Sequence, residues 1–508
     1  MLKKWILPLL LGGLMLTGCA TNPVTGEREM GLVSESMELQ TGSKQFGPSR
    51  QMQGGDYKLD PALSRYVSEV GGKLAKVSDR KLPYEFVIIN DSTPNAWALP
   101  GGKIAVNRGL LLELDSEAEL AAVLAHEIVH AAARHGAKNI ERGLLLQGAV
   151  IATGVATRDS DYSKLAVGAA AVGANLLNQR YSRGAELEAD AYGMRYMHRA
   201  GYDPMAAVKL QKTFVRLNEQ RKSNWLAGLF SSHPPSQERV DQNRETEKAL
   251  GSGGEMGRQR YQKRIAYLKS VKPAYDAYSE GVTALKKKQT DKALQLADKA
   301  IAIEPREALF HALKGDVLAR KKQYRSASRA YNRAVQKDSD FFRHYLQRGL
   351  VRSKLGNRAG SRRDLQKSIE LLPTAAAHHA LGQIALAEGD RKSAITHFRK
   401  ASSSGSRIGK ESALALARLD LPSNPGRYIK SGLRVTNGRL MVVIGNASPV
   451  AVRDLAVSLI SPKGKRQLRV DGTVPAGKRV TVSTGIALPN KDKLKGWRVS
   501  VVRARVVE

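Results

Sequence analysis

The sequence predicts a multidomain protein in which a mainly helical α+β domain is followed by an α-solenoid of helical repeats and an all-β, sandwich-like domain. Three observations predict this order: helical patterns mixed with short strands up to about residue 255, a 34-residue period between positions 272 and 420, and alternating apolar residues after position 427. The length of 508 residues agrees, since a chain of this size divides into roughly three domains.

Residues 1–19 are predicted to form a lipoprotein signal peptide. Lys3 and Lys4 precede an apolar run that is too short to span a bilayer and that ends in "LTGC". Cys19, the last of these residues, is the chain's only cysteine, and the four residues resemble a bacterial lipobox. The resemblance implies a lipid on Cys19, and Ala20 after it implies sorting to the outer membrane. We therefore expect a periplasmic lipoprotein anchored in that membrane.

The formal net charge of +35 is concentrated in the C-terminal half of the chain. Residues 272–508 carry 47 Lys and Arg against 19 Asp and Glu, a net charge of +28, which leaves +7 for the first 271 residues. Nucleic acid is the usual partner of such charge, but an exported lipoprotein does not routinely meet it, so no nucleic-acid partner is expected. An anionic envelope surface or acidic protein segments are more plausible partners than nucleic acid, and a merely solvated basic surface is an alternative of at least equal weight.

The segment 20–58 is polar, and the first domain is expected over residues 59–255. Tyr84–Asn90 and Lys103–Asn107 have the composition of strands, and the second follows a "PGG" turn, so together they predict a small sheet. We expect the strand Lys103–Asn107 to bind an extended substrate by β-augmentation.

A helix is predicted next, and both of its ends carry signals. Ser116 with Glu119 forms a capping box, apolar residues recur at helical spacing, and Gly136 follows the expected last turn. Two Gly- and Ala-rich apolar runs follow, Leu144–Thr157 and Leu165–Leu177. Both are shorter than the roughly 18 residues of a transmembrane helix, so they predict packed helices, with a shallow membrane contact as the alternative.

Residues 272–420 show a repeat with a period of 34. Small residues recur at fixed offsets, and this pattern resembles tetratricopeptide repeats, which are helix pairs whose close packing needs Gly and Ala. Gly281, Gly315 and Gly349 are 34 residues apart and Gly382 follows after 33, and the same spacing holds for Ala293, Ala327, Ser361 and Ala394. The pattern predicts four repeats with a capping helix at Lys410–Leu419.

After residue 427, alternating segments separated by "PKGK" and "PAGK" predict a β-sandwich over residues 427–508, expected to be a binding or structural module.

The stretch "AAVLAHEIVHAAARH" contains the first part of a candidate metal site. His126 and His130 are four residues apart on the predicted helix, so their imidazoles lie on one face and could share a zinc ion. Glu127 lies beside them and could accept a proton from water. Tetrahedral zinc in a hydrolytic site needs a third protein ligand, and "ELEAD" offers Glu186 and Asp190, four apart on a second predicted helix. Taken alone, that run is more often a solvated helix surface, but beside the H-E-x-x-H motif the interpretation as a metal ligand is favoured.

Four motifs in order identify a family resemblance. They are "NAWALPGGKIAVNRGLL", "HEIVHAAARH", "SRGAELEAD" and "SSHPPSQER", and over roughly residues 22–245 they resemble metallopeptidase family 48, the HtpX and CAAX prenyl protease type. With the lipobox and the repeats, the chain resembles periplasmic protease-chaperones of outer-membrane protein assembly. The β-sandwich departs from that two-part pattern.

The resemblance implies a gluzincin-type domain with one zinc ion and a role for each matching residue. It implies His126, His130 and Glu186 as zinc ligands, Glu127 as the general base, and Asp190 as a carboxylate that receives an N–H from a ligand histidine. A histidine before two prolines is more often a surface residue, but the resemblance implies that His233 reaches the zinc as a fourth ligand or gate. It implies an electrostatic or structural role for Arg239 beside His233. Arg134 and His135 belong to the extended motif and are expected to be structural.

The expected function is therefore zinc-dependent endopeptidase activity, with possible chaperone activity, on unfolded or misassembled envelope proteins. A first alternative is a scaffold or chaperone whose repeat groove holds a client or the outer-membrane assembly machinery, with little proteolysis. A second is a basic module, residues 272–508, that attaches the chain to the anionic envelope.

Overall fold

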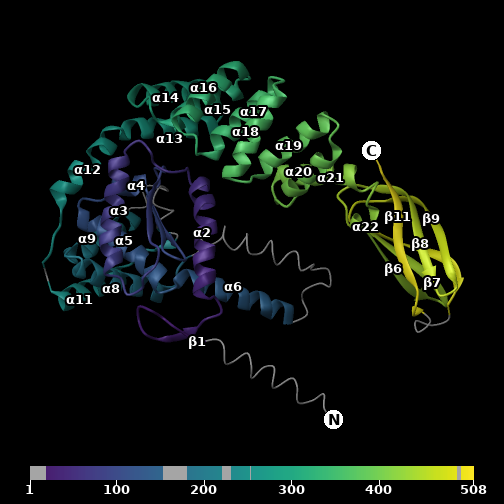
Figure 1. Cartoon of the computed structure of the whole chain (residues 1–508), viewed down its shortest axis with the longest axis horizontal. Helices are drawn as coiled ribbons and strands as arrows, with labels where there is room; N and C mark the ends of the chain where they lie inside the picture. The colour runs from purple at the N-terminus through teal and green to yellow at the C-terminus, as the bar shows by residue number, and fades with distance from the viewer. Residues whose placement is uncertain are drawn as a thin grey trace, which may run out of the picture. The chain divides into compact units, whose positions relative to one another are not determined.

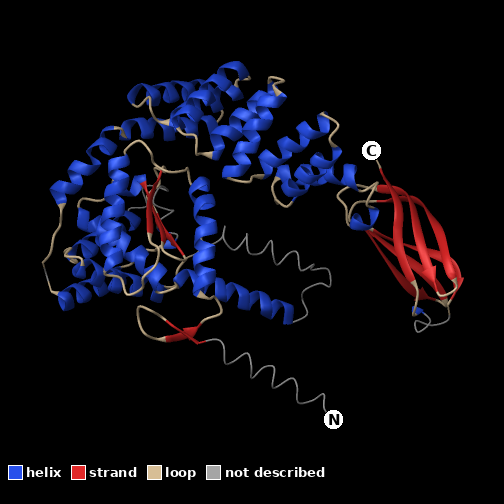
Figure 2. Cartoon of the chain, viewed as in Figure 1, coloured by secondary structure: helices blue, strands red, loops and turns tan. Residues whose placement is uncertain are grey.

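The structure is a computed structural model that describes residues 19–152, 180–219, 230, 232–251, 253–488 and 494–507. Apart from Cys19, the predicted signal peptide lies outside these residues, as do the second apolar run and the end of the first. Within the described part, no helix is both long and apolar enough to cross a membrane. The chain divides into two compact units, Met1–Lys322 with Asn332–Phe341, and Gln323–Tyr331 with Phe342–Glu508. Among the described residues, strands form a short ribbon, one small sheet and the C-terminal part of the chain (Figure 2).

The first unit contains a helical domain around a small sheet, followed by the first helical repeats (Figure 1). Its strands are β1 (Cys19–Thr21), β2 (Arg28–Met30), β3 (Glu85–Ile89), β4 (Ala96–Leu99) and β5 (Lys103–Asn107). Its helices are α2 (Glu35–Met52), α3 (Pro61–Lys76), α4 (Arg108–Leu111), α5 (Glu117–Ala132), α6 (His135–Ala152), α8 (Arg183–Arg199), α9 (Met205–Glu219), α11 (Gln237–Leu250), α12 (Arg258–Ser270), α13 (Lys272–Lys286), α14 (Thr290–Ile303) and α15 (Ala308–Arg320).

The small sheet has three strands in the order β3-β5-β4, one more than predicted. β3 runs parallel to β5, with Glu85 opposite Lys103, and β4 runs antiparallel on its other side, with Ala96 opposite Val106. β4 has only four residues without alternation, which is why its sequence gave no strand signal. Because β5 is paired on both sides, the expectation that it binds an extended substrate is wrong: the edges of this sheet are β3 and β4.

The predicted helix is α5, which packs against β4, α3, α8 and α9. The Ser116 side chain accepts a hydrogen bond from the Glu119 amide, as the capping box predicts. The C-terminal end differs from the prediction, because α5 ends at Ala132 and the left-handed residue is Arg134, with φ 62°, rather than Gly136. Gly136 instead lies in α6, where a Cβ would come 3.1 Å from Pro100 Cγ.

The helical repeats form as the 34-residue period predicts. Within the first unit, α13 packs against α14 and α14 against α15. The repeated glycines allow close contacts: a Cβ on Gly281 would lie 2.8 Å from Leu313 Cδ2, and one on Gly382 would lie 2.8 Å from the Phe398 ring. A side chain at these positions would push the helices apart, so the period reflects close packing.

The first repeats are joined to the preceding domain through Glu307, which precedes α15. Its carboxylate accepts hydrogen bonds from Asn90, 3.1 Å away at the end of β3, and from the Tyr275 hydroxyl. The Arg108 guanidinium lies 3.4 Å above the Tyr275 ring centroid and also donates to Asn90. Because these groups are buried together, this junction fixes α13–α15 on the domain that carries the site.

The second unit contains the later repeats and the C-terminal strands. Its elements are α17 (Phe342–Lys354), α18 (Arg358–Leu371), α19 (Ala375–Ala387), α20 (Arg391–Ser402), α21 (Arg407–Asp420), α22 (Pro425–Tyr428), β6 (Ile429–Thr436), β7 (Arg439–Asn446), β8 (Val452–Ser461), β9 (Gly464–Val474), β10 (Arg479–Ala487) and β11 (Arg498–Val506). The residues of α16 (Tyr324–Lys337) are divided between the two units. The predicted capping helix corresponds to α21.

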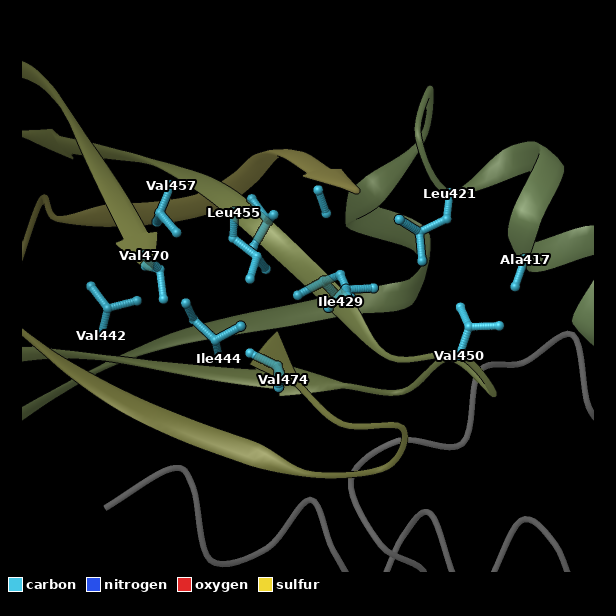
Figure 3. Close-up of a cluster of buried hydrophobic side chains, with 13 residues drawn as sticks. Ala417, Leu421, Ile429, Val442, Ile444, Val450, Leu455, Val457, Val470 and Val474 are labelled. Carbon is cyan, nitrogen blue, oxygen red and sulfur yellow. The ribbon is translucent and has the colours of Figure 1, made fainter. Parts of the chain in front are cut away.

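The C-terminal strands form two antiparallel sheets, β10-β7-β6 and β11-β8-β9, which confirms the predicted sandwich. A shared core includes Val442 and Ile444 from the first sheet and Val457 and Val470 from the second (Figure 3). Ala417, on α21, joins the same core, so the last repeat helix and the sandwich fold against one another.

Candidate metal centre

Helix α5 places His126 and His130 on one face, one turn apart. Their Nε2 atoms are 3.0 Å apart and face the same point. His130 is buried and His126 is partly exposed. The spacing of four residues on a helix is sufficient to produce this pair.

Helix α8 brings Glu186 to the two histidines. The Ser182 side chain caps α8, and Gly193 allows it to approach α5 so closely that a Cβ there would lie 3.2 Å from the backbone nitrogen of His126. Glu186 Oε2 is 3.5 Å from His126 Nε2, and Oε1 is 3.4 Å from His130 Nε2. The two predicted helices therefore meet at the predicted residues.

His233, in the segment that leads into α11, reaches the same point. Its Nδ1 is 3.3 Å from His126 Nε2 and 3.0 Å from Glu186 Oε1, and the residue is only 6% exposed. One nitrogen or oxygen from each of His126, His130, Glu186 and His233 lies within 4.8 Å of the others.

These four residues fit a zinc ion. Ligand atoms about 2.0–2.1 Å from a tetrahedral zinc lie about 3.3 Å from one another, close to the separations in this cluster. Imidazole and carboxylate are also the donors of hydrolytic zinc sites. Among the described residues, Glu127 Oε2 is buried without a hydrogen-bond partner, as expected of an atom that faces a water molecule.

The charges around the cluster stabilise one another in the metal-free chain. Burial favours neutral groups, but His233 and His126 hold the pKa of Glu186 well below its usual range. Burial alone would lower the pKa of His126, whereas its hydrogen bonds to Asp190 and Glu186 raise it to about 10. The pKa of Glu127 is raised by its burial, and that of His130 is lowered by the same cause. A metal ion at this point would therefore compete with a proton on His126.

Asp190 and Arg239 form a charged pair behind the cluster. Asp190 Oδ1 lies 2.9 Å from His126 Nδ1 and accepts a hydrogen bond from Arg239 Nη2 at 2.7 Å. Arg239 Nε donates to the other oxygen of Asp190 at 2.7 Å, and its Nη1 is 2.9 Å from Glu186 Oε2. Burial opposes ionisation, yet Arg239 holds the pKa of Asp190 below its usual value. One guanidinium thus neutralises two buried carboxylates.

His135 is in contact with the cluster, a role that the sequence did not reveal. Its Nδ1 is 2.8 Å from His130 Nδ1, and its Nε2 is 3.5 Å from Glu188 Oε1. Glu188 also accepts a hydrogen bond from Asn22 at 3.1 Å. If Nδ1 of His130 donates to His135, Nε2 of His130 is left unprotonated toward the cluster. The neighbouring Arg134 has the expected structural role, since it pairs with the buried Glu38.

Tyr181 is a further site residue that sequence reasoning missed. Its ring stacks on His130, with centroids 3.8 Å apart and an interplanar angle of 14°. The only available signal was its position directly before Ser182, the capping residue of α8. Its contact restricts the orientation of the His130 ring.

An apolar pocket opens beside His126 and Glu127, between α5, α8 and α9. Its lining includes Val123, Met194, Met197, Leu210 and Phe214. The polar cluster therefore borders a surface that could accept an apolar side chain.

Comparisons with known proteins agree with this geometry. Residues 60–247 match the family described as Peptidase family M48, and residues 375–404 match the family described as Tetratricopeptide repeat. Over 193 residues, 37% of this chain and 39% of the relative, the chain is 34% identical to a "Putative beta-barrel assembly-enhancing protease" of Vibrio cholerae.

Two further relatives show the same pattern. The chain is 30% identical to the "Beta-barrel assembly-enhancing protease" of Escherichia coli K12 over 38% of its own length and 42% of the relative. It is 36% identical to the "Mitochondrial metalloendopeptidase OMA1" of Schizosaccharomyces pombe over 34% of its own length and 50% of the relative. The chain thus spans between about two fifths and one half of the length of these relatives.

Among solved structures, the chain resembles "Crystal structure of MamA protein", at 20% identity and a TM-score of 0.25 over 29% of this chain and 80% of that one.

Proposed function

We infer, from the premise that residues 60–247 are a peptidase family M48 domain, that this chain is a zinc-dependent endopeptidase. The match confirms the resemblance that the four motifs predicted. The observation that carries the inference is the convergence of four ligand atoms beside a buried glutamate. The test is hydrolysis of an unfolded β-barrel protein by the zinc-loaded chain, which a Glu127→Gln variant should lack.

In the proposed mechanism, His126 and His130 would hold a zinc ion through Nε2, and Glu186 would hold it through its carboxylate. When bound, zinc would supply a Lewis acid that acidifies water and polarises a peptide carbonyl. Glu127 follows His126 on α5, and its Oε2 has no hydrogen-bond partner within the described chain. This carboxylate accepts the proton of the attacking water and delivers it to the leaving amine. Asp190 orients His126, and Arg239 keeps Asp190 ionised.

We propose that His233 closes the site in the resting chain. Its Nδ1 lies among the proposed ligand atoms, where water would otherwise enter, and its Nε2 is 3.5 Å from Glu127 Oε1. Movement of the segment that contains His233 would then admit substrate and free Glu127 to accept a proton.

Replacement of His233 by alanine should therefore raise the rate of hydrolysis of an unfolded protein. The measurement is turnover by zinc-loaded chains, together with X-ray absorption at the zinc edge, which should lose one imidazole. His198→Ala is the matched control, because His198 is exposed at the end of α8. An unchanged rate with unchanged zinc content would show that His233 is no gate.

His135 is expected to hold His130 in the tautomer that binds zinc. Its replacement by alanine should weaken zinc binding by about 10–100-fold, because the Nδ1 hydrogen of His130 would lose its acceptor. Competition with a chromophoric chelator measures this affinity. A His135→Gln variant, which keeps an acceptor, should lose less, and equal affinities for the alanine variant and the unaltered chain would contradict the assignment.

We propose unfolded or misassembled outer-membrane proteins as substrates. The relatives named beta-barrel assembly-enhancing proteases support this class. The edge of β4 could pair with an extended client, because Ala96 on this strand also lines the pocket beside His126.

The repeats would contact the assembly machinery, and lipid on Cys19 would anchor the chain to the outer membrane, facing the periplasm. We also propose the domain boundaries 1–19, 20–58, 59–255, 272–420 and 427–508.

A scaffold or chaperone is the second candidate function, and the position of His233 favours it. A site whose open coordination position is filled would turn over slowly, while the repeats could bind clients continuously. Complementation of a deletion strain separates the two functions: full rescue by Glu127→Gln favours the scaffold, and failure to rescue favours the protease.

A further inference from the structure

The C-terminal sandwich carries a large part of the basic charge of the chain. Residues 427–508 contain 17 Lys and Arg against 4 Asp and Glu, a net charge of +13. The proposed protease activity assigns no role to this charge. The register of the strands shows how it is arranged on the sheet β11-β8-β9.

One face of this sheet points into the core, and the other is strongly basic. Leu455, Val457 and Val470 are buried between the sheets (Figure 3). Val501 belongs to the same buried core. Because side chains alternate along a strand, the intervening residues face outward. The exposed cations on that outer face, which we call the cationic face, are Arg453, Lys465, Arg469, Arg498, Arg503 and Arg505.

The cations lie side by side across the strands. Arg498 and Lys465 both pair with Ile460 of the central strand β8, one from each side, and Arg503 and Arg469 both pair with Ala456. Arg505 pairs directly with Arg453. Like charges placed opposite one another weaken a sheet. Stability of the sandwich therefore does not explain their arrangement.

These charges are poorly neutralised within the chain. The three strands contain only two acidic residues, Asp454 and Asp471. Arg505 lies 3.5 Å from Asp454, and within the described ranges the other five cations have no carboxylate within 4.0 Å. The cationic face is therefore available to an external polyanion.

Two exposed aliphatic side chains lie among the cations. Ile460, between Arg498 and Lys465, is 41% exposed, and Val502, at the irregularity next to Arg503, is 46% exposed. The three strands contain no aromatic residue on which a nucleic-acid base could stack. Cations mixed with exposed aliphatic groups instead match the headgroup region of an anionic bilayer, which offers phosphates above hydrocarbon.

We propose that the cationic face of the β11-β8-β9 sheet binds the surface of a bilayer that contains anionic phospholipid. This contact is independent of the zinc site and of the proposed protease activity. It would act in addition to the lipid proposed on Cys19, by an electrostatic attraction that the lipid does not supply.

The test is binding of the full chain to vesicles with and without phosphatidylglycerol in phosphatidylcholine. The measured quantity is the gain in affinity that the anionic lipid produces, because a lipid on Cys19 contributes equally to both vesicle types. For a variant with Arg453→Gln, Arg469→Gln and Arg503→Gln, this gain in affinity should be about 100-fold smaller at low salt. High salt should reduce the gain for the unaltered chain.

The matched control removes the same charge from the other sheet. Lys430, Arg434 and Arg479 are exposed on β6 and β10, and their replacement by glutamine should leave the gain nearly unchanged. Equal losses in both variants would show that total charge, rather than this face, drives binding, and would overturn the proposal. A variant with Arg453→Lys, Arg469→Lys and Arg503→Lys should retain the gain, because headgroups require charge rather than guanidinium geometry.

Two other results would also overturn the proposal. One is the absence of any gain with phosphatidylglycerol. The other is tighter binding to a DNA duplex than to anionic vesicles at the same salt concentration. Circular dichroism of each variant verifies that the sheets remain folded, so a loss of binding can be assigned to the surface.

Discussion

Replacement of Glu127 by glutamine should lower the rate of hydrolysis of an unfolded protein by about 10²–10⁴-fold while zinc remains bound. Glutamine has nearly the same shape as glutamate but cannot accept a proton from water at neutral pH. The zinc ligands proposed on either side, His126 and His130, are left unaltered. Release of peptides from an unfolded client, measured at equal zinc content, gives the ratio of rates.

A control variant excludes a general effect of removing one negative charge. The control is Glu245→Gln, because Glu245 lies on α11 with its side chain 67% exposed, whereas Glu127 is buried. It should cleave at the rate of the unaltered chain. If Glu127→Gln retains zinc and also cleaves at that rate, Glu127 is not the base. Loss of zinc from the variant would instead show that Glu127 helps to hold the metal.

Replacement of Arg239 by methionine should destabilise the metal-free site by about 3–5 kcal/mol. Arg239 is buried and neutralises both Asp190 and Glu186, so its loss leaves two uncompensated carboxylates in the interior. Hydrogen exchange of the amides in α5 and α8 measures the free energy of local opening. Arg244→Met, on the same helix with its side chain 47% exposed, should change little.

A double variant distinguishes lost charge balance from lost packing. Asp190→Asn added to Arg239→Met removes one of the two stranded charges, so part of the stability should return. If the double variant is as unstable as the single one, the effect of Arg239 comes from its packing. If Arg239→Met matches Arg244→Met, the buried charge pair contributes little to stability.

The sequence predicted local features well because they depend on few residues. The four-residue spacing of His126 and His130 requires only a helix, and the N-cap at Ser116 requires only its neighbours. The meeting of α5 with α8 depends on a distant close approach at Gly193, which no local pattern contains. The residues alone therefore offered both Glu186 and Asp190 as candidates, and the family resemblance, rather than geometry, selected Glu186 as the ligand.

Features that depend on tertiary pairing were missed or misplaced. The central position of β5 follows from β4, a strand too short to produce a periodic signal. The end of α5 was placed at Gly136 because glycine usually takes the left-handed conformation, which here falls on Arg134. Arg134 has the left-handed conformation, and its side chain pairs with Glu38. These two residues are about a hundred positions apart in the sequence, so no local pattern contains their contact.

The contact between Asn22 and Glu188 has a consequence for where the chain can work. Asn22 follows Cys19 by three residues, which span at most about 10–11 Å when extended. If Cys19 carries lipid, only these three residues separate the bilayer from Asn22, which contacts Glu188 beside His135. The zinc site would then search a thin layer next to the membrane rather than the full volume of the compartment. Clients that stall while inserting would meet it at high effective concentration, and freely diffusing proteins would rarely do so.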